Sequence, residues 1–143
     1  MPETQPDHSF IVRDNEQAAA RALVAGDFIQ AYLLVHALIE SLLCIFLRVE
    51  EQDTTFHALI ERYKRFLAEE EYPEPTFVKE LTDFNRRRNR IVHQLWRKGF
   101  SFTNRQAEPA ARAAVTVYGL FIEWLETFDP AIKARGFRYD EGA

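Results

Sequence analysis

Three side chains that stand close together in the sequence, Arg88, Asn89 and His93, are suited to cleaving RNA without a metal ion. The reaction needs a base for the 2′-hydroxyl, a proton donor for the leaving oxygen and positive charge against the phosphorane. A free imidazole has a pKa of about 6.5 and exchanges protons near neutrality, while a guanidinium stays charged and binds phosphate oxygens in pairs. One His and one Arg make half of such a set, so we expect a symmetric homodimer to complete the cleft.

The residues around this group are strongly basic in a chain that is acidic overall. The formal net charge is −4, yet residues 84–107 hold seven basic side chains and no acidic one, which leaves −11 for the remainder. Such an uneven charge distribution steers an anion to one face of a protein. We therefore expect RNA to bind through the exposed cations of this stretch: Arg86, Arg87, Arg90, Arg97 and Lys98.

Three aromatic residues, Trp96, Phe100 and Phe102, are interleaved with the last of these cations. Aromatic rings beside positive charges can stack on unpaired bases of a single-stranded nucleic acid. The same rings can instead pin the loop that leads into the next helix. The sequence leaves both interpretations open.

The hydrophobic pattern predicts an all-α fold, an antiparallel up-and-down bundle of four or five helices. Apolar residues recur at helical spacing, and no useful length of the chain alternates with a period of two. Gly26 should end the first helix, Asp27 should cap the second, and residues 53–55 should cap the third. The predicted helices cover about residues 14–24, 28–48, 56–67, 76–96 and 109–128.

Length and composition favour one domain at residues 11–130, with a flexible N-terminus at 1–10 and a C-terminal tail at 131–143. The single Cys44 lies in an apolar run, which predicts an inert core thiol in a reducing cytoplasm. The four histidines are too scattered for a metal site, and no glycine-rich phosphate loop is present, so neither a metal nor a cofactor is expected. No segment indicates export or membrane insertion.

Arg88 stands near the middle of the apolar stripe of its predicted helix, since Leu81, Phe84 and Ile91 lie within about 60° of it at about 100° per residue. A buried arginine needs a carboxylate or an anionic ligand, because an unpaired buried charge costs several kcal/mol. Glu40, on the polar line of the second helix, is the internal candidate. Either Arg88 forms a structural ion pair with Glu40 in a non-catalytic module, or it meets an RNA phosphate.

The run Arg88-Asn89-Arg90-Ile91-Val92-His93 resembles the motif of the HEPN superfamily, an Arg, a polar residue and a His on a late helix of a four-helix bundle. The resemblance covers most of residues 10–128 in the order of helices. It implies a metal-independent endoribonuclease of toxin or defence type, acting as a dimer. Arg88 and His93 would be the catalytic pair, Asn89 an auxiliary and Glu40 an accessory residue.

The resemblance also implies a partner, because some members are restrained by a nucleotidyltransferase antitoxin encoded beside them. In that group a tyrosine two residues after the His accepts the nucleotide, but here Leu95 occupies the position, followed by Trp96. A partner that masks the site sterically, or no partner, fits this sequence better. Other members serve as dimerisation or nucleotide-binding modules, and an antitoxin-like subunit whose acidic faces cover a basic partner is a further alternative.

Overall fold

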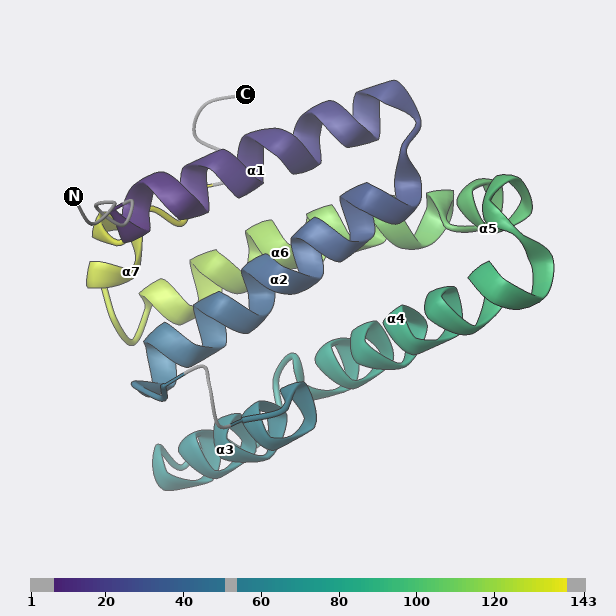
Figure 1. Cartoon of the computed structure of the whole chain (residues 1–143). Coiled ribbons are helices and arrows are strands. Elements are labelled where there is room, and N and C mark those ends of the chain that lie inside the picture. Colours follow the sequence, from purple (N-terminus) through teal and green to yellow (C-terminus); the bar gives the residue numbers. More distant parts are fainter. Residues whose placement is uncertain (1–6, 51–53, 139–143) are drawn as a thin grey trace.

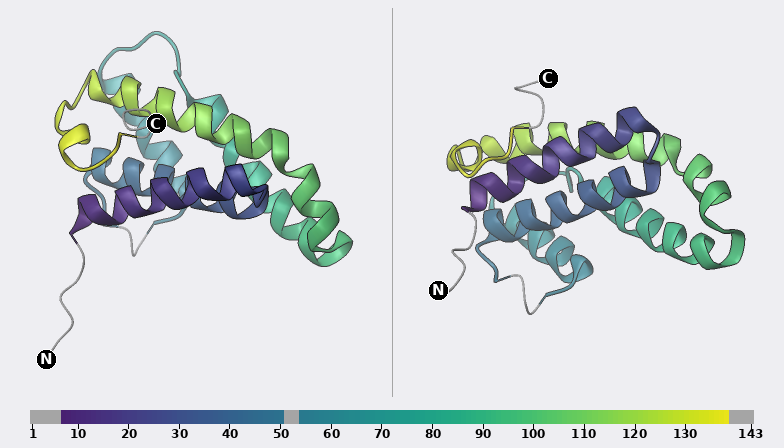
Figure 2. Two further views of the ribbon diagram at one scale, coloured as in Figure 1. Left: turned by 90° about the horizontal axis from the view of Figure 1, so that it is seen from above. Right: turned by 45° about the horizontal axis from the view of Figure 1, so that its top comes forward.

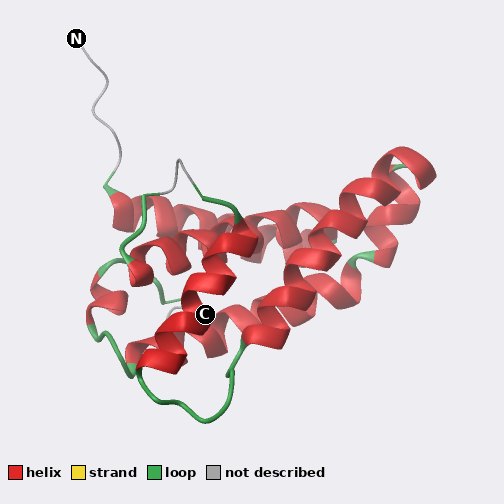
Figure 3. Cartoon of the chain, turned by 90° about the horizontal axis from the view of Figure 1, so that it is seen from below, coloured by secondary structure: helices red, strands yellow, loops and turns green. Residues whose placement is uncertain are grey.

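The computed structural model describes residues 7–50 and 54–138, and within these ranges the chain forms seven helices and no strand (Figures 1 and 3). The all-α prediction is therefore confirmed. The helices are α1 (His8–Ala25), α2 (Phe28–Leu47), α3 (Phe56–Glu69), α4 (Val78–Lys98), α5 (Phe100–Gln106), α6 (Glu108–Glu126) and α7 (Ala131–Ala134). Five of them match predicted segments, whereas α5 and α7 were not predicted.

The central element is α2, which contacts α1, α3, α4, α5 and α6. Its apolar residues occur almost all round the helix, and ten of its side chains are buried, among them Tyr32, Val35 and Leu42. A helix that is apolar on every side must be covered on every side. Figure 1 accordingly shows α1 and α6 along one side of α2, with α3 and α4 along the other.

Among the described helices, α2 alone is long and apolar enough to cross a membrane, a test that core helices of soluble proteins also pass. Of its most apolar stretch, 56% is buried inside the bundle. Cys44, on the same helix, is buried as expected of a core thiol.

The junction between α1 and α2 is held by a residue from far along the chain. Gly26 ends α1 with φ 80°, the left-handed conformation that glycine adopts most easily. Asp27 is the N-cap residue of α2, as predicted, but its side chain makes no capping hydrogen bond. Instead Asn104 of α5 accepts from the backbone N–H of Ile29 at 3.1 Å and donates to the carbonyl of Gly26 at 2.8 Å.

The two ends of the described chain pack against each other, which revises the boundaries drawn at residues 10 and 130. Helix α1 begins at His8, and Ile132 and Phe137, assigned to a tail, are fully buried. Gly136 passes so close to α1 that an added Cβ would lie 2.9 Å from the Cα of Ser9. The compact part of the chain therefore reaches from the first turn of α1 to Arg138.

The opposite end of the molecule is open. Figures 1 and 2 show the C-terminal half of α4 and the short α5 projecting past the beginning of α2 before the chain returns along α6. Within α4, which the structure describes throughout, the buried residues are Leu81, Phe84 and Ile91, and none of residues 92–98 is buried. Gly99, with φ 83°, forms the bend between α4 and α5.

Candidate functional site

The three residues singled out for RNA cleavage lie on one open side of α4. Arg88, Asn89 and His93 are all exposed. Nη1 of Arg88 donates to Oδ1 of Asn89 at 3.3 Å, so the amide orients the guanidinium. His93 follows Asn89 by one helical turn, which places imidazole, amide and guanidinium on neighbouring positions of the helix surface.

The expectation that Arg88 is buried was wrong, because its side chain is exposed. The apolar stripe of α4 is covered at Phe84 and Ile91, but the long stem of Arg88 carries its charge out to solvent. Glu40 is half-buried on α2. An exposed guanidinium is available to a phosphate, which a buried ion pair would not be.

The turn of α4 that precedes Arg88 is held in place by contacts with α2. The hydroxyl of Tyr32 donates to the backbone carbonyl of Phe84 at 2.5 Å. His36 stacks on the rings of both Phe56 and Phe84, at centroid distances of 4.5 and 5.3 Å, and its Nε2 is 3.3 Å from Oδ1 of Asn85. These contacts anchor the backbone one turn before the candidate site.

Burial lowers the pKa of His36, the hydrogen bond to Asn85 opposes this, and the nearby charge of Arg88 lowers the pKa further. His36 is therefore neutral at neutral pH and adds no positive charge beneath Arg88. Its part is to position α4. Asn85 could not be recognised as its partner from the sequence, because an asparagine in a helix has no distinctive spacing.

The predicted RNA-binding cations are exposed, as the sequence led us to expect. Nη1 of Arg86 lies 3.7 Å from the carboxylate of Asp83, whereas Arg87 and Arg90 line a groove of about 430 Å³ between α4 and α6. The amides of Gln94 and Gln106 line the same groove. Arginines beside amide groups suit a phosphodiester backbone, which offers acceptor oxygens.

Farther along α4 and α5 the cations lie over aromatic rings. The guanidinium of Arg97 is 5.3 Å from the centre of the Trp96 ring, and Nζ of Lys98 is 5.7 Å from that of Phe102. Trp96 is 73% exposed and Phe100 61% exposed, which is unusual for rings of this size. The segment is a helix rather than the predicted loop, and the hydrogen bonds of Asn104 tie it to the start of α2.

The comparisons give no family. No protein-family model matches this chain, and no curated protein and no solved structure matches it either. What the site can do is therefore argued from its own side chains.

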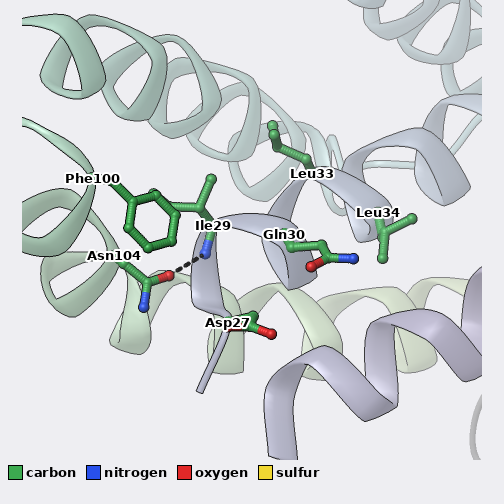
Figure 4. A pocket seen from close by; sticks show the side chains of 7 residues that line it. All are labelled: Asp27, Ile29, Gln30, Leu33, Leu34, Phe100 and Asn104. Carbon is green, nitrogen blue, oxygen red and sulfur yellow. Dashed lines mark hydrogen bonds between the residues drawn. The ribbon is translucent and has the colours of Figure 1, made fainter. Parts of the chain in front are cut away.

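A pocket of about 470 Å³ lies where α5 meets the first turns of α2, and sequence reasoning missed it. Figure 4 shows the ring of Phe100 next to Ile29, with Leu33 and the side-chain amide of Gln30 farther from the ring and Asn104 bonded to the backbone of Ile29. Asp27 lines the other edge. The walls of the pocket come from segments about 70 residues apart, so the local sequence pattern could not predict it.

Within the described residues, no group of three or more His, Cys, Asp or Glu side chains is placed to hold a metal ion. The buried carboxylate that the sequence did not reveal is Glu16 on α1. Oε2 of Glu16 accepts from the Tyr118 hydroxyl at 2.7 Å and from the backbone N–H of Arg138 at 3.2 Å. Burial raises the pKa of Glu16, and these hydrogen bonds partly oppose the rise.

Proposed function

We propose that this chain is a metal-independent endoribonuclease of toxin or defence type, related to the HEPN superfamily that its motif resembles. The observation that carries the proposal is the joint exposure of Arg88, Asn89 and His93 on one side of a basic helix. A guanidinium held by an amide, with an imidazole one turn away, supplies the charge and the proton transfer that cleavage of RNA requires.

The reaction proposed is a phosphoryl transfer from the 5′-oxygen to the 2′-oxygen within the RNA strand. The 2′-oxygen attacks the adjacent phosphorus, the bond from phosphorus to the 5′-oxygen breaks, and a 2′,3′-cyclic phosphate remains. A neutral imidazole takes the 2′-proton, and a protonated imidazole gives a proton to the leaving 5′-oxygen. Arg88 stabilises the negative charge that builds up on the phosphorane oxygens.

The two proton transfers need two imidazoles in different protonation states, and this chain offers one at the site. We therefore propose that two copies form the working enzyme, with His93 of each copy facing one cleft. RNA is the partner that the basic side chains favour. We also propose that an antitoxin of the nucleotidyltransferase type masks the site, and that the enzyme acts in the cytoplasm.

The test is to incubate the wild type and a His93→Ala variant with mixed RNA in excess EDTA and to analyse the ends of the products. We expect fragments ending in 2′,3′-cyclic phosphate from the wild type, and a rate about 10²- to 10⁴-fold lower from His93→Ala. His57→Ala is the matched control, because His57 is exposed and belongs to α3, outside the basic stretch of residues 84–107. Equal cleavage by wild type and His93→Ala, or no cleavage by folded wild type, would contradict the proposal.

A further inference from the structure

The exposed aromatic rings at the projecting end of the molecule are not used by the chemistry described above. Trp96, Phe100 and Phe102 all lie in the last turn of α4 or in α5, and Trp96 follows His93 by three residues. Three residues make nearly one turn, so Trp96 and His93 are neighbours on the same open side of α4. A strand whose phosphate meets Arg88 and His93 therefore runs next to Trp96.

We propose that the surface of Trp96 and Phe100, together with the pocket beside Phe100, binds unpaired bases of single-stranded RNA. This inference rests on the proposed ribonuclease function and specifies its substrate as RNA without a complementary strand. Bases of a duplex are stacked on each other and have no free face for a protein ring. Unpaired bases have free faces, and stacking on aromatic side chains is their usual mode of recognition.

The charges around the rings favour a nucleic acid over an apolar partner. Arg97 lies over Trp96 and Lys98 lies over the neighbouring Phe102, so cations that can meet a phosphate accompany the base stacked on Trp96. The sequence from 84 to 107 contains no acidic residue.

The pocket extends the surface by one binding position. Phe100, Ile29 and Leu33 give it an apolar wall, and the amide of Gln30 offers both a donor and an acceptor (Figure 4). A volume of about 470 Å³ is within the range of small-molecule sites and leaves room for a base. One base would stack on Trp96 of α4 and the next base on Phe100 of α5, so the RNA would cross the bend at Gly99.

Asn104 keeps these two binding positions in register. Its side chain bonds the start of α2 and the end of α1, and it belongs to the same short helix as Phe100. The ring of Phe100 is thereby held against the wall that α2 provides. A rigid platform binds bases with less loss of conformational entropy than a mobile one.

The experiment measures binding of an RNA of about ten nucleotides, within the usual length of such sites, to the full chain carrying His93→Ala, which slows cleavage. The same RNA is tested as a single strand and as a duplex at one salt concentration. Adding Trp96→Ala or Phe100→Ala should weaken single-strand binding about 5- to 100-fold and change duplex binding little. Phe10→Ala is the matched control, because Phe10 is also 61% exposed but lies on α1.

Tryptophan fluorescence gives a second readout at saturating RNA. Stacking should quench the emission of Trp96, and the quenching should be absent from the Trp96→Ala variant. Trp124 remains as an internal reference, because it is half-buried and packed against Tyr72 and Phe128.

Unchanged single-strand binding in both Trp96→Ala and Phe100→Ala would overturn this inference, and cleavage of the same RNA by the wild type would then show that the ribonuclease function stands without it. Conversely, loss of binding in these variants with no cleavage by the wild type would support the surface and contradict the enzyme. If Trp96→Ala dissociates a dimer in sedimentation experiments, a second copy covers the ring and the inference is overturned.

Discussion

The two ends of this molecule differ in whether their ionisable side chains are buried or exposed. At the end where α1, α6 and the last described residues meet, the carboxylate of Glu16 is buried and hydrogen-bonded to Tyr118 and Arg138. At the end formed by α4 and α5, Arg88, Arg90 and Lys98 are exposed. An acidic side chain enclosed with hydrogen-bond partners belongs to the packing of the fold, whereas charge left in solvent is available to a ligand. Variants at the first end should change stability, and variants at the second should change activity.

The largest effect on stability should come from removing a buried side chain at the end where α1, α6 and the last described residues meet. Phe137→Ala removes a fully buried ring, and we expect the free energy of unfolding to fall by about 3–5 kcal/mol. Urea denaturation followed by circular dichroism measures this. Phe10→Ala, at an exposed ring on α1, should change it by less than about 0.5 kcal/mol. A small effect of Phe137→Ala would mean that the C-terminal segment does not belong to the core.

Arg88→Ala should produce the converse result at the open end. We expect RNA cleavage to slow by about 10²- to 10³-fold, because the phosphorane loses its guanidinium, while stability changes by less than about 0.5 kcal/mol. Single-turnover cleavage and urea denaturation of the same preparations separate the two quantities. Arg21→Ala removes one exposed charge from α1 and serves as the control. A loss of several kcal/mol in stability would restore the interpretation of Arg88 as a structural residue.

A smaller effect is expected from Tyr118→Phe, which keeps the ring and removes only the hydroxyl that donates to Glu16. Leaving a buried carboxylate oxygen without this donor should lower stability by about 1–3 kcal/mol. Cleavage of RNA should be unchanged, since the pair lies at the other end of the molecule. The double variant Tyr118→Phe with Glu16→Gln should lose less than the sum of the single losses if the two groups are coupled.

The pH dependence of stability gives the smallest and most specific test. Because burial raises the pKa of Glu16 above its ordinary value of 4.5, the folded protein holds this proton more tightly than the unfolded chain. Protonated Glu16 therefore favours folding below about pH 4.5, and this contribution declines as the pH rises through the folded-state pKa. The stability of the wild type relative to Glu16→Gln should be higher at pH 4 than at pH 7. A difference that does not vary with pH would place Glu16 in contact with solvent.

The sequence predicted the helices better than it predicted their surroundings. Helical spacing and the end signals at Gly26 and Thr55 placed five helices close to where they are, and Thr55 does cap α3 through Ala58. Helix α5 was missed because Phe100–Gln106 makes only two turns, too few for a periodic pattern. Helix α7 has only four residues, and the burial of Phe137 depends on α1, which is distant in sequence.

The error at Arg88 has a physical origin. An ideal helix gives the angle at which a side chain leaves the axis, and by that measure Arg88 belongs with Phe84 and Ile91. The angle does not say whether another helix covers that position or how far a long side chain reaches. The burial of Glu16 was missed for a related reason, since its partner Tyr118 is 102 residues away. The exposure of His93 and the basic side chains followed directly from local sequence.

The bond between Asn104 and the N–H of Ile29 makes one backbone amide a reporter for the whole projecting end. That N–H has no carbonyl partner within α2, because it lies in the first turn, so its protection from hydrogen exchange depends on α5 staying docked. Local opening of α5 would expose this amide while the rest of α2 keeps its protection. Its exchange rate thus measures how often the aromatic platform detaches, and bound RNA that rests on the platform would slow it.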